Sequence, residues 1–167
     1  LLEYDITRAI ARVASATKPV IGIMSAGVWA NINRGADDMP PNSLAIGLRG
    51  QQFEWIATYS GADGQMGTPD DHTTRNELHI PVGRPIAITL EAQDVIHSFF
   101  VPAFRVKQDA VPGMRIPVWI EATTPGQYEI ACAELCGMGH YRMRAMVTVH
   151  TAEDYERWLA QSRVAVA

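Results

Sequence analysis

The sequence predicts an all-β sandwich or barrel with a short C-terminal helix and an N-terminal helical segment ahead of it. From residue 44 onward, short runs of branched and aromatic residues recur, separated by glycine, proline and aspartate. Residues 34–43 form a polar, proline-rich linker before these runs, and an amphipathic stretch follows residue 151. We therefore expect an N-terminal helical segment with its linker at 1–43, and a β-domain with a C-terminal helix at 44–167.

The N-terminal segment reads as a helix followed by a short apolar run. Residues 3–16 place Ile6, Ile10 and Val13 at helical spacing, and Lys18-Pro19 ends the pattern. The longest apolar run, 20–30, is about half the length of a membrane span, so no transmembrane helix is predicted. Because the chain begins without an initiator Met or a secretory signal, we expect a fragment, a processed form or an engineered piece.

The β-domain is predicted from strands at regular spacing and the turns between them. Turn residues lie at 81–83, 112–113 and 124–126, and a long Gly/Asp/Pro loop spans 59–71. The expected strands are 44–49, 52–59, 77–80, 86–91, 97–101, 116–122, 127–132 and 146–150. Thr151 caps the last helix, 152–161, and Asp154 three residues later completes a variant of the capping box.

Composition is that of a globular domain with a mildly acidic surface. The chain is 47% hydrophobic and 19% charged, with a net charge of −4. At 167 residues it can bury a sizeable core. The negative sign disfavours nucleic acid as a partner and is compatible with a basic protein partner.

The chemically informative stretch is 128–148, where Cys132, Cys136, His140 and Met143 lie between two expected strands. Thiolates, imidazole and a thioether select soft or borderline metals, chiefly copper and zinc. Without Cys132, the loop and an upstream histidine, His97, would supply the ligands of a blue-copper site. With it, two cysteines can bridge two copper ions, each with one histidine and one weak axial ligand. Such a closed ligand set suits electron transfer, because no substrate needs to bind the metal.

Other interpretations of these residues remain open at this point. A Cys132–Cys136 disulfide would close a very small loop, where the geometry is demanding. A structural zinc site would normally take a fourth strong ligand in place of Met143. His97 alone could be a structural histidine, and Met143 could fill space in the core.

Three motifs together resemble subunit II of cytochrome c oxidases, from about residue 28 to the final helix. They are DVIHSF at 94–99, VKQDAVPG at 106–113 and CAELCGMGHYRM at 132–143. The resemblance implies a cupredoxin-like Greek-key fold around a binuclear copper centre, CuA. It also implies a proton-translocating respiratory haem–copper oxidase in the cell membrane, with this domain facing the periplasm or cell exterior. Electrons would pass from cytochrome c to CuA and then to haem in subunit I.

The resemblance assigns a role to each matching residue. His97 and His140 would each bind one copper, and Cys132 and Cys136 would bridge both. Met143 would bind one copper through sulfur, and Glu134 the other through its backbone carbonyl. The Glu134 carboxylate would also reach a magnesium ion at the boundary with subunit I, near a turn that contains Lys107 and Asp109. Glu134 favours an oxidase over the alternative of a nitrous oxide reductase-like enzyme, which typically has an aromatic residue there.

Two positions depart from the family pattern. Phe53 stands where the family has a tryptophan that receives the electron, so Trp55 either replaces that residue or is a core aromatic. We expect the docking surface to include Trp55, Asp94 and carboxylates of the 59–71 loop. The first 27 residues lack the two membrane helices of the family, which keeps open a soluble electron carrier that is not attached to an oxidase. A disulfide-bonded structural β-domain is a further alternative.

Overall fold

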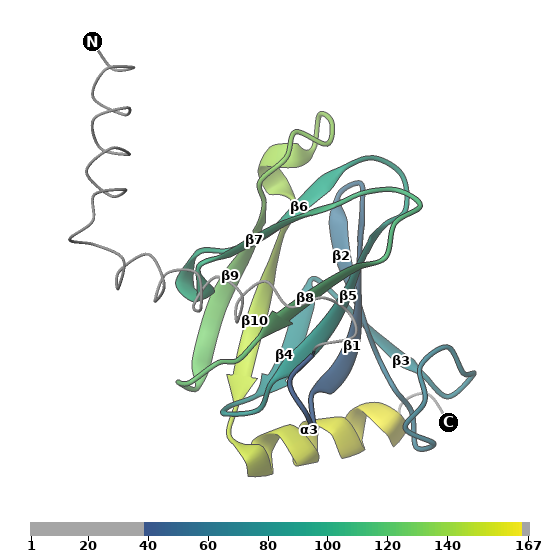
Figure 1. The fold of residues 1–167 in the computed structure, drawn as a ribbon, viewed down its shortest axis with the longest axis vertical. Coiled ribbons are helices and arrows are strands. Elements are labelled where there is room, and N and C mark those ends of the chain that lie inside the picture. The colour runs from purple at the N-terminus through teal and green to yellow at the C-terminus, as the bar shows by residue number, and fades with distance from the viewer. Residues whose placement is uncertain (1–38, 165–167) are drawn as a thin grey trace, which may run out of the picture. The chain divides into compact units, whose positions relative to one another are not determined.

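The computed structural model describes residues 39–164, which form two five-stranded sheets packed face to face (Figure 1). One sheet has the order β3-β2-β1-β5-β8, and the other has the order β4-β10-β9-β6-β7. The strands are β1 (Leu44–Gln51), β2 (Glu54–Tyr59), β3 (His72–Arg75), β4 (Glu77–Pro81), β5 (Ile86–Ala92), β6 (His97–Val101), β7 (Val106–Ala110), β8 (Ile116–Ile120), β9 (Gly126–Cys132) and β10 (Arg144–His150). This arrangement confirms the predicted all-β, cupredoxin-like fold.

Most neighbouring strands are antiparallel, but each sheet contains one parallel pair. β1 runs parallel to β5, and β4 runs parallel to β10. Both pairs join strands that are distant in the sequence, 44–51 with 86–92 and 77–81 with 144–150. The antiparallel strands β9 and β10 flank the 132–143 loop, and β9 also pairs with β6.

The core is a layer of aliphatic and aromatic side chains between the two sheets. Alternate residues of β1 and β5 point inward, as in Ile46 and Leu48 of β1 and Ile86, Ile88 and Leu90 of β5. This period of two is what a half-buried strand requires. The other fully buried large side chains are Trp55, Tyr59, Leu78, Ile80, Phe99, Ile130 and Met143.

Two strands were not predicted, and each has few apolar residues. β3 is the polar sequence His72-Thr73-Thr74-Arg75 at the edge of its sheet, where it pairs with β2 alone. β7 was expected to belong to a turn, but residues 106–110 pair with β6 and the turn follows at Pro112-Gly113. Lys107 and Asp109 therefore lie on an edge strand, which corrects their assignment to the turn.

The C-terminal helix α3 (Ala152–Val164) covers the end of the sandwich opposite the β9–β10 loop (Figure 1). The predicted cap is present: the Asp154 N–H donates to Thr151 Oγ1 over 3.2 Å. Trp158 of α3 stacks on His79 with ring centroids 4.3 Å apart, and the His79 and His150 rings share a 2.8 Å hydrogen bond. These contacts fix the helix against β4 and β10.

The predicted helix at 3–16, the apolar run at 20–24 and most of the linker lie outside the described residues. Within 39–164, no helix is long and apolar enough to cross a bilayer.

Candidate metal centre

The candidate metal centre lies at the end of the sandwich opposite α3, where β6 begins and β9 ends. Phe99 of β6 pairs with Cys132, so the paired strands place His97 beside that cysteine. The chain then forms the ligand loop, passes through the short 3-10 helix His140–Arg142, and returns to β10. The Cys132 N–H donates to the Met143 carbonyl over 3.1 Å, which closes the loop at its base.

The predicted ligands converge on one small volume. The sulfur atoms of Cys132 and Cys136 are 3.9 Å apart, and both thiols are free and buried. His97, which is fully buried, forms with these two cysteines a group whose ligand atoms all lie within 4.8 Å of one another. Residues from β6 and from the β9–β10 loop therefore build one site.

Around the two sulfurs, the remaining donors divide into two similar halves. Near Cys132 Sγ lie the His97 Nδ1 atom, at 3.9 Å, and the Glu134 carbonyl oxygen, at 3.2 Å. Near Cys136 Sγ lie the His140 Nδ1 atom, at 3.6 Å, and the Met143 Sδ atom, at 3.7 Å. Each sulfur thus has one imidazole nitrogen and one weaker donor beside it.

This donor set fits a soft or borderline metal held by two cysteines. Zinc–thiolate bonds are about 2.3 Å long, and with that length as a guide, two donors up to about 4.6 Å apart can bind one ion. The Cys132–Cys136 and His97–Cys132 separations, both 3.9 Å, fall inside this limit. Thiolate, imidazole and thioether donors are the set that copper takes in electron-transfer proteins.

Asp94 holds His97 in the orientation that the site requires. Its Oδ1 atom is 2.8 Å from His97 Nε2, which leaves Nδ1 to face Cys132. The same carboxylate accepts hydrogen bonds from the backbone N–H groups of Gln52 and Val95, each over 2.7 Å. Partial burial alone would raise the pKa of Asp94, but the hydrogen bonds from Gln52, His97 and Val95 outweigh it and lower the pKa. The carboxylate is therefore charged at neutral pH.

Burial has the opposite effect on the cysteines. It raises the pKa of the Cys136 thiol to about 11, with a further contribution from neighbouring Cys132. Without a metal, this thiol is protonated at neutral pH, so a metal that binds the thiolate displaces its proton.

The turn between β1 and β2 packs against the ligand loop. The Gln52 side-chain amide donates to the Cys136 carbonyl over 2.5 Å. The Phe53 ring covers Gly139, where a side chain would overlap it, and the Arg142 guanidinium lies 5.7 Å from the ring centroid. Sequence reasoning did not identify Gln52, because 84 residues separate it from Cys136 and no local pattern links the two.

Several predicted residues lie away from the ligand atoms. The Glu134 side chain is exposed, and only its carbonyl points toward the site. On β7, Asp109 accepts hydrogen bonds from Ser98 and Lys107 at 2.7 and 3.3 Å. The Ser98 hydrogen bond is the main cause of the lowered pKa of Asp109.

The structure places two of the expected docking features away from the surface of the ligand loop, and it confirms the core alternative for Trp55. Trp55 is 1% exposed and sits in the core, with its ring edge toward His97 at a centroid distance of 6.1 Å. It therefore offers no surface to a partner. The 59–71 loop follows the end of β2 that pairs with Ile46, far from the turn that touches the ligand loop. Figure 1 shows the backbone of this loop near α3, at the opposite end of the sandwich.

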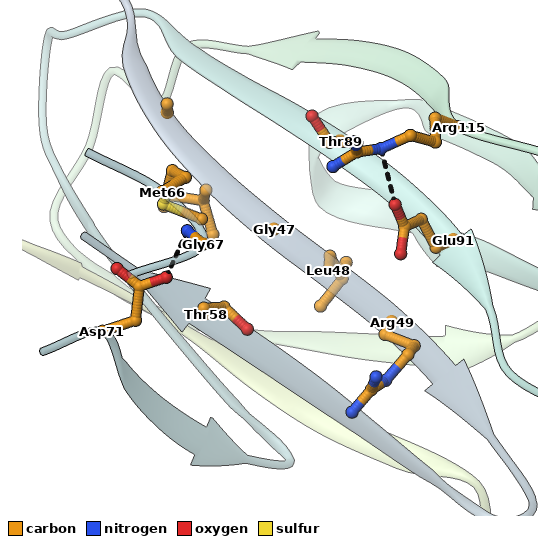
Figure 2. Close-up of a pocket in the computed structure, with 12 residues that line it drawn as sticks. Gly47, Leu48, Arg49, Thr58, Met66, Gly67, Asp71, Thr89, Glu91 and Arg115 are labelled. Atoms are coloured by element: carbon orange, nitrogen blue, oxygen red, sulfur yellow. Dashed lines mark hydrogen bonds and ion pairs between the residues drawn. The ribbon is translucent and has the colours of Figure 1, made fainter. Parts of the chain in front are cut away.

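A separate concavity lies on the outer face of β1, β2 and β5 (Figure 2). It has a volume of about 360 Å³ and contains the Arg115–Glu91 ion pair, with 2.8 Å between the paired atoms. None of the predicted metal ligands lines it, whereas Asp71 of the 59–71 loop does.

The sequence matches the family described as cytochrome c oxidase subunit II, periplasmic domain, over residues 49–150. Cytochrome c oxidase subunit 2 of Thermostichus vulcanus is 43% identical over 155 residues, which are 93% of this chain and 42% of that protein. Alternative cytochrome c oxidase subunit 2 of Bradyrhizobium diazoefficiens is 37% identical over 147 residues, covering 75% of this chain and 53% of that protein. The chain thus spans about half the length of these relatives.

Solved structures show the same similarity. The periplasmic domain of subunit II of cytochrome oxidase (CoxB) of Bradyrhizobium japonicum aligns with a TM-score of 0.68 and 27% identity. That alignment covers 78% of this chain and 100% of the other. A mixed disulfide intermediate between a thioredoxin-like protein and subunit II of cytochrome c oxidase aligns with a TM-score of 0.65 and 28% identity, covering 78% and 97%. The chain belongs to the cytochrome c oxidase subunit II family and corresponds to the periplasmic domain of that subunit.

Proposed function

We propose that this chain supplies the electron-accepting domain of an aerobic respiratory haem–copper oxidase. It would take electrons from cytochrome c at a binuclear copper centre and deliver them to haem in subunit I. The observation that carries the proposal is the pair of buried sulfurs, 3.9 Å apart, each with one imidazole and one weaker donor beside it. Because each sulfur has its own imidazole and its own weaker donor, the donors suit two metal ions better than a single ion.

In this proposal, Cys132 and Cys136 would hold both copper ions through their thiolates. His97 and the Glu134 carbonyl complete one half, and His140 and Met143 complete the other. When bound, the copper pair supplies a one-electron redox centre. The chain's contribution is to hold these donors in a buried, hydrogen-bonded frame that changes little between redox states.

The surroundings of the loop support docking of a larger partner there. Ile96, Leu135, Met138 and Tyr141 are exposed apolar side chains on the ligand loop and beside His97. Exposed apolar groups gathered around a functional site are typical of protein interfaces. We propose that this end faces subunit I and the electron donor, on the periplasmic or outer side of a membrane complex. A magnesium ion at the Glu134 carboxylate would need ligands from another chain, because the described residues gather no oxygen cluster around it.

We also propose which residues form the copper-binding domain. The domain that binds copper would be 44–167, with 1–43 in the place of the family's membrane helices. The family assignment favours the oxidase over a nitrous oxide reductase-like enzyme. A soluble carrier with the same centre is the second candidate, and purification of the native complex with or without subunit I separates the two.

The mixed disulfide of the similar structure, between a thioredoxin-like protein and subunit II, supports a proposal about how the cysteines are kept reduced. We propose that an oxidised Cys132–Cys136 pair is reduced by a thioredoxin-like dithiol. One thiolate of the reductant attacks one sulfur of the disulfide, which forms a mixed disulfide and frees the other cysteine as a thiolate. The second thiol of the reductant then attacks the mixed disulfide and displaces the cysteine held in it. Two protons and two electrons pass to this chain, and the reductant leaves as its own disulfide.

Copper reconstitution of the reduced chain tests the proposed function. The parent chain is expected to bind two copper ions and to give the EPR spectrum of a mixed-valence pair. Cys136→Ser should abolish that spectrum and Met143→Leu should perturb it. Met146→Leu, an exposed methionine on β10, is the matched control and should leave it unchanged. An unchanged spectrum in Cys136→Ser would refute the bridging role.

A further inference from the structure

The turn between β1 and β2 touches both segments that carry the metal ligands. Gln52 is exposed, yet its side-chain amide reaches across to the ligand loop and donates to the Cys136 carbonyl over 2.5 Å. Its backbone N–H donates to Asp94 Oδ2 over 2.7 Å, and Asp94 Oδ1 is 2.8 Å from His97 Nε2. Gln52 therefore binds both segments: its side chain contacts Cys136 of the ligand loop, and its backbone contacts Asp94, which orients His97.

The backbone at Gly137 shows that the β1–β2 turn and the ligand loop lie very close together. Gly137 has a φ of +134°, and a Cβ atom placed there would lie 2.7 Å from Gln52 Nε2 and 3.2 Å from the Phe53 ring. A side chain at 137 would push the turn and the loop apart. Glycine at this position allows the loop to come near enough for the Gln52 amide to reach the preceding carbonyl.

We propose that Gln52 is a positioning residue of the metal centre. Its side chain fixes the carbonyl of Cys136, and its backbone fixes Asp94, so the two ligand-bearing segments keep one relative position. The role in metal binding rests on the proposed function, but the effect on the loop does not. Without the amide, the Cys136 peptide is free to rotate, and the Cys136 sulfur moves relative to His140 and Met143.

The metal-free chain gives the first test. The rate of alkylation of the buried Cys136 thiol by iodoacetamide reports how often the loop opens. In Gln52→Ala this rate should rise roughly tenfold, which is the order expected when one hydrogen bond to a charged or buried group is lost. Gln52→Glu keeps the backbone hydrogen bond to Asp94 but replaces the amide donor with a carboxylate, so the rate should rise at least as much. Gln51→Ala is the control, because the Gln51 amide pairs with Glu54 and not with the loop.

The copper-loaded chain gives the second test, in a property that loss of stability alone would not change. Gln52→Ala and Gln52→Glu should shift the copper hyperfine splitting and the visible absorption maxima, while Gln51→Ala keeps the parent spectra. The proposal is overturned if both Gln52 variants alkylate within twofold of the parent, or if Gln51→Ala changes as much as they do. If the parent chain forms no binuclear copper centre, the proposed function fails, and alkylation still decides the role of Gln52.

Discussion

Replacing Gly139 by alanine puts one methyl group into the space that the Phe53 ring occupies. The Gly139 backbone has φ −91° and ψ 7°, which alanine also adopts, so the change tests packing and not backbone strain. A Cβ atom there would lie 2.6 Å from Phe53 Cγ and 2.7 Å from Cε2. Ordinary carbon contacts are about 3.5–4.0 Å, so the ring or the loop must move by about 1 Å.

Overpacking of this kind typically costs about 1–3 kcal/mol. For a chain of this size, each kcal/mol lowers Tm by about 2–4 °C. We therefore expect Gly139→Ala to reduce the free energy of unfolding of the metal-free, reduced chain by about 2 kcal/mol. The assay is urea denaturation followed by circular dichroism, with the slope checked against the parent.

Two further variants make this prediction specific. Gly47→Ala is the matched control, because its Cβ would lie 3.4 Å from Thr58 and 3.5 Å from Met66, which the site tolerates. The double variant Phe53→Ala/Gly139→Ala should be more stable than the sum of the single losses predicts, because the overlap is gone. Gly139→Ala could instead be as stable as the parent, or the double variant could lose as much free energy of unfolding as the two single variants together. Either result would contradict the close packing of Phe53 on Gly139.

Three other predictions concern the support of the site and the opposite end of the sandwich. Asp94→Ala should weaken copper binding about 10–100-fold, because it removes the group that orients His97; chelator competition measures this, and an unchanged affinity would contradict it. Burial lowers the pKa of His79, and burial together with His79 lowers that of His150. Their contribution to stability is therefore full above the unfolded pKa of about 6.5 and is lost as pH falls through the lower folded values. Urea midpoints should drop between pH 7.5 and 5.5, and less so in a variant with both histidines changed to Gln; equal drops would refute the assignment. Trp158→Ala should cost about 2–4 kcal/mol by releasing α3, and a loss below about 0.5 kcal/mol, as at ordinary surface positions, would show that the stack contributes little.

The ligand loop could be predicted because its information is local. Cys132, Cys136, His140 and Met143 lie between two strands whose alternation is clear in the sequence. His97 was identified because a blue-copper site needs a histidine near the end of an earlier strand, and His97 lies at one end of the expected strand 97–101. The strand β3 could not be predicted, since its residues are polar and its pairing with β2 depends on the tertiary fold.

The surroundings of the loop could not be predicted in the same way. Gln52 reaches Cys136 and Asp94 through hydrogen bonds across 84 and 42 residues, and such contacts leave no periodic trace. A tryptophan such as Trp55 can lie at the surface or in the core. Its core position becomes clear only in the structure, where it packs against His97 and Phe99. The direction of β2 places the 59–71 loop at the far end, which composition alone cannot reveal.

The central claim is that Cys132 and Cys136 bridge two copper ions, and the EPR spectrum of the copper-loaded chain tests it most directly. A thiol titration first shows that both cysteines are reduced. Failure to bind copper then cannot be explained by a Cys132–Cys136 disulfide. The claim predicts hyperfine structure from one unpaired electron shared equally by two copper nuclei, with two copper ions bound per chain. A spectrum from a single copper nucleus, or one bound ion per chain with both thiols reduced, would contradict it.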